Sequence, residues 1–155
     1  MRSKSILILG VGNLLLGDEG IGIHVAQRLQ KMALPHDVEV IDGGTGGFEL
    51  IEQCHGRKKI IIVDAILADA EPGSVLRFTP EDVELQWHPS YSSHQSGLRE
   101  LLHFCKQLVP LPEIVVYGIA PKETQSLSTR LSEAVTSSLA KLIAEVLEEV
   151  KRTTE

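Results

Sequence analysis

The sequence predicts an α/β fold in which helices alternate with the strands of a largely parallel sheet. Short runs of aliphatic residues, such as 6–9 and 60–63, are typical of strands that are buried on both faces. Between such runs lie segments whose apolar residues recur at helical spacing, as they do from 98 to 108. Strands that alternate with helices in this way usually form a parallel sheet, so we expect this architecture.

The length and composition of the chain indicate a single domain over residues 1–155. A chain of 155 residues of which 43% are hydrophobic can bury a substantial core. The net charge of −6 and the absence of a basic run argue against nucleic acids and anionic membranes as partners. We find no bilayer-spanning run and no export signal, and we expect Cys54 and Cys105 to be reduced core thiols. These features predict a cytoplasmic protein.

Residues 5–24 are the most informative stretch, and they predict a strand, a glycine loop and a helix. The run Ile6–Leu9 stops at Gly10, and four more glycines follow before residue 23. Because glycine adopts backbone angles that side chains forbid, the loop is expected to have a tight, specific shape. An amphipathic helix is expected from Asp18–Glu19 to about Lys31.

The acidic pair at the end of this loop argues against a dinucleotide site. A dinucleotide-binding turn would carry its third glycine where Leu15 stands. Asp18 and Glu19 would also repel a phosphate at the helix N-terminus, whereas carboxylates at a loop mouth suit a cation. The structural alternative is that Asp18 caps the helix and that Glu19 stabilises its first turn.

The remaining elements continue the alternation of strands and helices. Four more strands are expected, at 38–41, 59–64, 74–78 and 114–117. Three more helices are expected: a short one that stops at Gly56, one at 95–108, and one from about Ser128 to about Lys151. No helix is available to cross over to the strand at 74–78, so we expect that strand to be antiparallel.

Four residues that can bind a metal or carry a proton are expected near the carboxyl ends of the strands, where open α/β sheets bind ligands. Glu19 follows the first strand, Asp42 ends the second and Asp64 ends the third. His94 closes a long polar loop just before a helix. Carboxylates and an imidazole are a suitable ligand set for a divalent metal. Capping or surface roles stay open for Asp42, Asp64 and His94.

Four pieces of the sequence resemble the hydrogenase maturation endopeptidases, which process the large subunit of [NiFe] hydrogenases. The pieces are ILGVGNLLLGDEGIGIHV (8–25), IDGGTGGFELIE (41–52), IIIVDAI (60–66) and SSHQSGL (92–98). The loop that contains G-D-E-G is the specific part, and the last third of the chain matches only in layout. The resemblance implies a twisted, five-stranded, mostly parallel sheet sandwiched between helices.

The resemblance also implies a site and a substrate. It implies that Glu19, Asp64 and His94 bind metal and that Asp42 supports recognition or cleavage. Members of this family remove a C-terminal extension from the large-subunit precursor after nickel insertion, and the cut follows a basic residue. The nickel is expected to come with the substrate, although another divalent metal can occupy such a site in vitro. A monomer is also implied.

Alternatives remain open from the residues themselves. A non-proteolytic, nickel-dependent chaperone would bind its client through the same ligands and release no shorter product. A different metal-dependent peptidase or amidohydrolase would cleave small peptides without a nickel protein. A nucleotide-binding module would be stabilised by nucleotides. For the endopeptidase, either the bound metal or a nearby carboxylate would activate the water.

Overall fold

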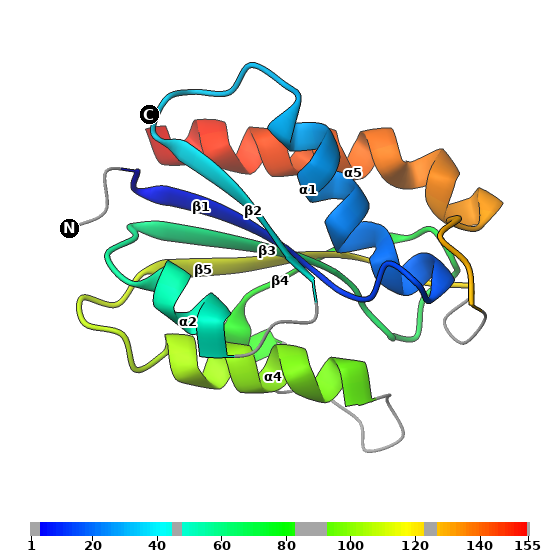
Figure 1. The fold of residues 1–155 in the computed structure, drawn as a ribbon, viewed down its shortest axis with the longest axis horizontal. Helices are drawn as coiled ribbons and strands as arrows, with labels where there is room; N and C mark the ends of the chain where they lie inside the picture. The colour runs from blue at the N-terminus through cyan, green and yellow to red at the C-terminus, as the bar shows by residue number, and fades with distance from the viewer. Residues whose placement is uncertain (1–3, 45–47, 83–92, 123–126, 155) are drawn as a thin grey trace.

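The computed structural model describes residues 4–44, 48–82, 93–122 and 127–154. Its five strands form one sheet in the order β2-β1-β3-β5-β4 (Figure 1). The strands are β1 (Ile6–Val11), β2 (Val38–Gly44), β3 (Lys59–Ala65), β4 (Val75–Phe78) and β5 (Glu113–Ile119). β4 pairs antiparallel with β5, and the other neighbours pair in parallel, which confirms the predicted α/β architecture and the exception at the fourth strand.

The helices cover both faces of the sheet (Figure 1). They are the short 3-10 helix η1 (Gly17–Gly20) and the α-helices α1 (Ile21–Gln30), α2 (Phe48–Cys54), α4 (Ser93–Cys105) and α5 (Glu133–Thr154). α1 and α5 pack on one face, and α2 and α4 pack on the other. No helix among the described residues is both long and apolar enough to cross a membrane.

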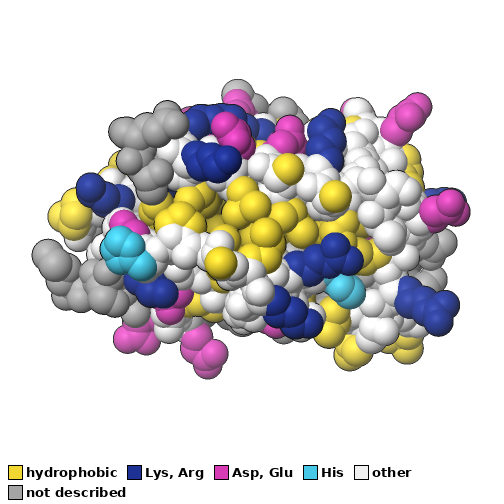
Figure 2. All heavy atoms as spheres, turned by 90° about the horizontal axis from the view of Figure 1, so that it is seen from above, with side chains coloured by type: hydrophobic (Ala, Val, Ile, Leu, Met, Phe, Trp, Pro, Cys, Tyr) yellow, Lys and Arg dark blue, Asp and Glu magenta, His cyan; other side chains and the backbone are white. Residues whose placement is uncertain are grey.

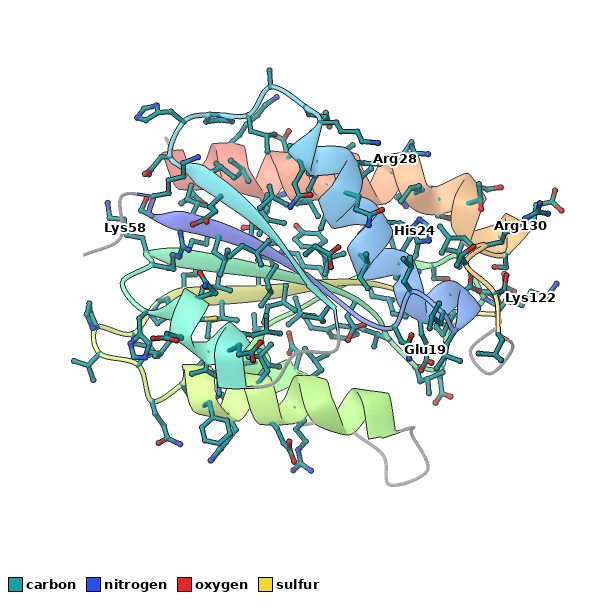
Figure 3. All side chains as sticks on the ribbon, viewed as in Figure 1. Glu19, His24, Arg28, Lys58, Lys122 and Arg130 are labelled. Atoms are coloured by element: carbon teal, nitrogen blue, oxygen red, sulfur yellow. The ribbon has the colours of Figure 1, made fainter. Side chains whose placement is uncertain are left out.

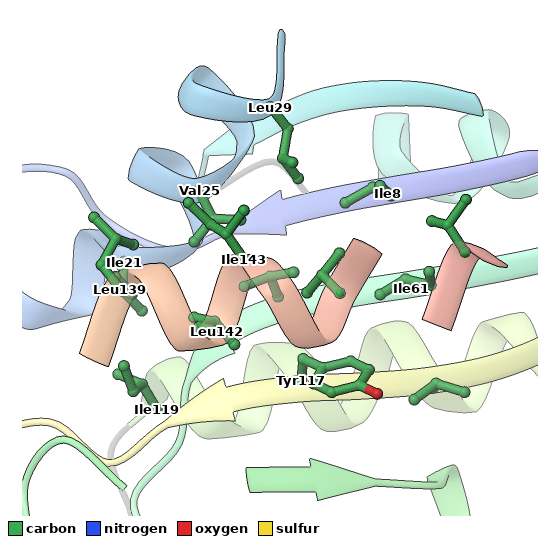
Figure 4. Close-up of a cluster of buried hydrophobic side chains, with 14 of the residues drawn as sticks. Ile8, Ile21, Val25, Leu29, Ile61, Tyr117, Ile119, Leu139, Leu142 and Ile143 are labelled. Atoms are coloured by element: carbon green, nitrogen blue, oxygen red, sulfur yellow. The ribbon is translucent and has the colours of Figure 1, made fainter. Parts of the chain in front are cut away.

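Each face of the sheet has its own aliphatic core, because side chains alternate between the two faces of a strand. In β1, Ile6 and Ile8 face α1 and α5, whereas Leu7 and Leu9 face α2 and α4. Figure 4 shows the first of these cores, where side chains from α1 and α5 meet those of β1, β3 and β5. On the outside of that layer, apolar side chains gather centrally with Lys and Arg side chains around them (Figure 2).

Two predicted helix boundaries were wrong because tertiary contacts override local periodicity. The last helix begins at Glu133 rather than near Ser128, because Ser128 forms an isolated parallel β-bridge with Leu16. Ser132 then caps the helix, its hydroxyl accepting a hydrogen bond from the Val135 amide at 3.4 Å. The helix predicted at 95–108 spans Ser93–Cys105, two residues earlier at its start and three at its end.

A buried ionic network ties α5 to the sheet. Lys59, the first residue of β3, donates to the Glu149 carboxylate from α5 at 2.5 Å. Tyr117 and Arg77 donate to the other oxygen of Glu149 at 2.8 and 2.9 Å. Because removing a charge from water is costly unless it is paired, these contacts allow Glu149 to be buried. The network is structural and involves none of the predicted site residues.

Candidate functional site

The strand order places a topological switch point at the carboxyl ends of β1 and β3. From β1 the chain passes to β2 on one side and then returns to β3 on the other side. Open α/β sheets bind ligands at such a switch in strand order, because the connections leave in opposite directions. Glu19 lies on η1, which follows β1, and Asp64 is the penultimate residue of β3. The sequence therefore places both carboxylates at the switch point.

Close backbone packing fixes η1 and the start of α1 over these strand ends. A Cβ atom on Gly22 would lie 2.2 Å from the Val11 carbonyl oxygen and 2.3 Å from that of Val63. Only glycine permits this approach, so the first turn of α1 lies directly on β1 and β3. The Asn13 amide also donates to the Glu19 carbonyl at 3.0 Å, which closes the loop onto η1.

Gly12 is the point at which the segments of Glu19 and Asp64 meet. Its φ of 140° is one that other residues rarely adopt. A Cβ atom there would lie 2.1 Å from the Glu19 carbonyl oxygen and 3.5 Å from Oδ1 of Asp64. Glu19 is 6% exposed and Asp64 is fully buried, with its Oδ1 accepting from the Ala65 amide at 2.8 Å. The backbone of Glu19 and the carboxylate of Asp64 therefore both lie against Gly12, and both residues are buried.

Asp42 lies at the same edge of the sheet but is exposed. Gly10 of β1 pairs with Asp42 on one side and with Val63 on the other, so Asp42 and Asp64 flank the end of β1. The Oδ1 atom of Asp42 accepts a hydrogen bond from the Gly44 amide at 3.2 Å. This contact is the turn interaction considered from the sequence, and it leaves the second carboxylate oxygen of Asp42 accessible to a ligand.

His94 is the second residue of α4, and its side chain lies outside the described residues. Among the side chains that are described, no group of three His, Cys, Asp or Glu residues gathers in the manner of a metal site. The predicted set of Glu19, Asp64 and His94 therefore stays a prediction. The two buried carboxylates fit its chemistry, since oxygen ligands favour divalent cations.

Asp18 does not cap α1, so this expectation was wrong. The N-cap position of α1 is Gly20, and no side chain caps it. The buried Asp18 carboxylate accepts hydrogen bonds from the Lys122 amide at 2.8 Å, the Ser132 amide at 2.7 Å and the Ser132 hydroxyl at 2.8 Å. Asp18 therefore joins η1 to the start of α5, a helix more than a hundred residues away in the chain.

His24 is a second residue near this junction, and sequence reasoning did not single it out. Burial lowers its pKa below the usual value, a hydrogen bond with the Thr129 backbone opposes this shift, and the Arg28 cation nearby lowers the pKa further. The hydrogen bond with Thr129 links α1 to the segment before α5, and Figure 3 shows the side chain of His24 on α1. A single histidine on a helix carries no sequence signal for such a contact.

Comparisons with known proteins give relatives over most of the chain. The family model described as hydrogenase maturation protease matches residues 23–149. A candidate hydrogenase maturation protease of Methanocaldococcus jannaschii is 38% identical over 98% of this chain and 100% of its own length. The hydrogenase 2 maturation protease of Escherichia coli is 37% identical, over 77% of this chain and 75% of its own.

A solved structure has the same fold. The hydrogenase-maturating endopeptidase HybD of Escherichia coli superposes with a TM-score of 0.83 and 32% sequence identity, over 99% of this chain and 94% of that protein. The similarity therefore extends across the sheet, both helix layers and the segments that carry the candidate site.

Proposed function

The chain belongs to the hydrogenase maturation protease family, and we propose that it removes the C-terminal extension from a nickel-loaded large-subunit precursor of a [NiFe] hydrogenase. Membership makes it a hydrolase of hydrogenase maturation. The timing of the cut, its position and the means of recognising nickel are the proposed parts. Two free, buried thiols support the further proposal that it acts in the cytoplasm. We also propose a monomer, as the resemblance to the family implies.

The observation that carries this proposal is the pair of buried carboxylates at the switch point. Glu19 and Asp64 come from different segments that both contact Gly12. A buried carboxylate is costly unless hydrogen bonds, another charge or a metal compensates it. In this proposal a divalent cation at the switch point provides such compensation for Glu19 and Asp64 when the client brings it.

We assign the third ligand to His94, at the start of α4. In this proposal Glu19, Asp64 and His94 hold nickel that arrives already bound to the client, and no resident cofactor is needed. Three protein ligands leave coordination positions open for the groups of the client that carry the ion. A precursor without nickel would offer these ligands no atom to bind, which would make cleavage conditional on nickel loading.

Asp42 has an assisting role in the proposal. It flanks the same strand ends and remains exposed, so it can contact the client chain beside the metal ligands. A metal ion polarises a carbonyl or a water molecule, and a nearby carboxylate can accept the proton of that water. Asp42 is our candidate for this carboxylate, acting on the peptide bond that is cut.

The test is to incubate the protein with nickel-loaded and nickel-free precursor and to measure intact product masses. We expect a shortened large subunit only from the nickel-loaded precursor. Glu19→Gln, Asp64→Asn and His94→Ala should each abolish processing without loss of the folded state by circular dichroism. His55→Ala, which changes an exposed histidine after α2, is the matched control and should process normally.

The outcomes separate the alternatives. Equal cleavage of nickel-free precursor would refute nickel recognition, and full cleavage by His94→Ala would remove that residue from the site. Tight stoichiometric binding without a shorter product would identify a chaperone rather than a protease. Cleavage of short peptides that lack nickel would indicate a general metal-dependent peptidase.

A further inference from the structure

The segment from 127 to 132 is hydrogen-bonded to the glycine loop beside the candidate site. The Ser128 amide donates to the Leu15 carbonyl at 2.9 Å, and the Gly17 amide donates to the Ser128 carbonyl at 2.8 Å. These bonds form the parallel bridge between Leu16 and Ser128. Because the Ser128 nitrogen is bonded to the carbonyl carbon of Leu127, its hydrogen bond to Leu15 brings the backbones of Leu15 and Leu127 next to each other.

Both of these leucines are exposed to solvent. Leu15 is 59% exposed and Leu127 is 84% exposed. A single exposed leucine is ordinary, but two adjacent ones on a hydrogen-bonded frame form a fixed apolar spot. Covering this spot would remove apolar surface from water, which favours association.

Two cations border the same spot. Lys122 and Arg130 are exposed, and neither forms an ion pair with an acidic side chain in the described part of the chain. Both project from the end of the molecule at which Glu19 lies (Figure 3). The whole chain carries a net charge of −6, so these two cations are a local exception. We call Leu15, Lys122, Leu127 and Arg130 the rim surface.

The rim surface is connected to the candidate site through Asp18. The Asp18 carboxylate holds the Lys122 and Ser132 amides at 2.8 and 2.7 Å, and Glu19 is the next residue. A chain segment that reaches Glu19 and Asp64 can therefore extend onto the rim surface. Because the frame is fixed by hydrogen bonds, little conformational entropy is lost on binding.

We propose that the rim surface docks the C-terminal extension of the client precursor, through carboxylates that face Lys122 and Arg130 and an apolar side chain that covers Leu15 and Leu127. This inference rests on the proposed function, because it takes the client from that proposal. The charge of the surface selects the occupant, since two exposed cations that pair with no acidic side chain of the described residues attract an anionic segment. The leucines require that this segment also carry an apolar residue.

The experiment measures cleavage kinetics and equilibrium binding of nickel-loaded precursor for paired variants. Lys122→Glu with Arg130→Glu reverses the charge of the rim surface. Its control, Lys31→Glu with Lys58→Glu, makes the same change at two exposed lysines on the amino edge of the sheet. We expect the rim pair to raise KM and Kd about tenfold, equivalent to about 1.4 kcal/mol, with kcat nearly unchanged. The control pair should match the unmodified protein.

The apolar part of the rim surface, Leu15 and Leu127, is tested by the same measurements. Leu15→Ser with Leu127→Ser should raise KM several-fold. The control is Val109→Ser with Leu111→Ser. These two apolar side chains precede β5 and are 90% and 65% exposed, and their replacement should have no effect on KM. A precursor whose tail carboxylates are replaced by lysines should restore binding to the charge-reversed variant.

The results distinguish failure of this inference from failure of the proposed function. Charge-reversed rim variants that bind precursor as tightly as their control would overturn docking at this surface. If the charge reversal weakens binding of a precursor that lacks its extension to the same degree, the contact lies on the body of the client instead. If the unmodified protein binds the precursor without cutting it, the protease assignment fails while the binding comparison still decides the docking surface. No binding by the unmodified protein would overturn both.

Discussion

Replacing Asp18 with asparagine should weaken the junction between η1 and α5 while leaving the shape of the side chain almost unchanged. The carboxylate accepts three hydrogen bonds, two at Oδ2 and one at Oδ1. All three donors are N–H or O–H groups of the segments before α5. An asparagine side chain has one acceptor oxygen, so its amide nitrogen must face at least one of these donors.

The expected loss of stability follows from the number and kind of these bonds. A hydrogen bond to a charged group contributes about 1.5–3 kcal/mol, and a buried donor left without a partner adds to the cost. Asp18→Asn loses at least one such bond and makes the others neutral, so we expect a free-energy loss of about 3 kcal/mol. For a domain of this size that corresponds to a Tm lower by roughly 6–12 °C.

Urea denaturation and amide hydrogen exchange measure this effect. The Lys122 and Ser132 amides should exchange faster in Asp18→Asn, and precursor binding should weaken because the rim surface loses its anchor. Asp37→Asn is the control, since Asp37 is partly exposed and its carboxylate accepts hydrogen bonds from the amide and hydroxyl of Ser5 at the amino edge of the sheet. A loss below about 1 kcal/mol, with both amides still protected, would refute the assignment of Asp18 as the anchor.

Two further predictions concern groups away from the site. Although burial is the largest single influence on Glu149 and opposes ionisation, hydrogen bonds from Arg77, Lys59 and Tyr117 lower its pKa to about 2 from 4.5. Its ionised form therefore stabilises the fold fully above pH 4.5, and this stabilisation is lost as the pH falls toward 2. In Glu149→Gln, the urea midpoint of denaturation should depend less on pH over that range. A hydrogen bond with Cys54, together with burial, raises the pKa of the Cys105 thiol. Both thiols should react with iodoacetamide only in denaturant, and rapid alkylation of the native protein would contradict their burial.

The sheet was predictable from the sequence because its strands depend on local composition. β1 and β3 are completely buried, and an aliphatic run without polar alternation is typical of that environment. The antiparallel direction of β4 also followed from local evidence, since the chain between β3 and β4 is too short for a crossover helix. Glu19 and Asp64 were correctly assigned to the carboxyl edge of the sheet because each closely follows or ends one of these aliphatic runs.

The role of Asp18 and the start of α5 were not predictable, because both depend on partners distant in the sequence. A buried aspartate beside a helix has the same local signature whether it caps that helix or holds another one. Its true partners, Lys122 and Ser132, lie 104 and 114 residues away. Similarly, helical periodicity near Ser128 gave no sign that this residue pairs with Leu16.

The proposed ligands of the candidate site come from both helix layers, so the geometry of the site depends on the packing of both layers. Glu19 is held by η1 and α1, which belong to the core shared with α5. His94 is the second residue of α4, which belongs to the separate core on the other face of the sheet. The sheet lies between these layers, and close packing at Gly12 and Gly22 fixes the backbone at the ends of β1 and β3. Core substitutions in either layer should therefore reduce client processing before they unfold the protein, because a metal site requires its ligands within a few tenths of an ångström.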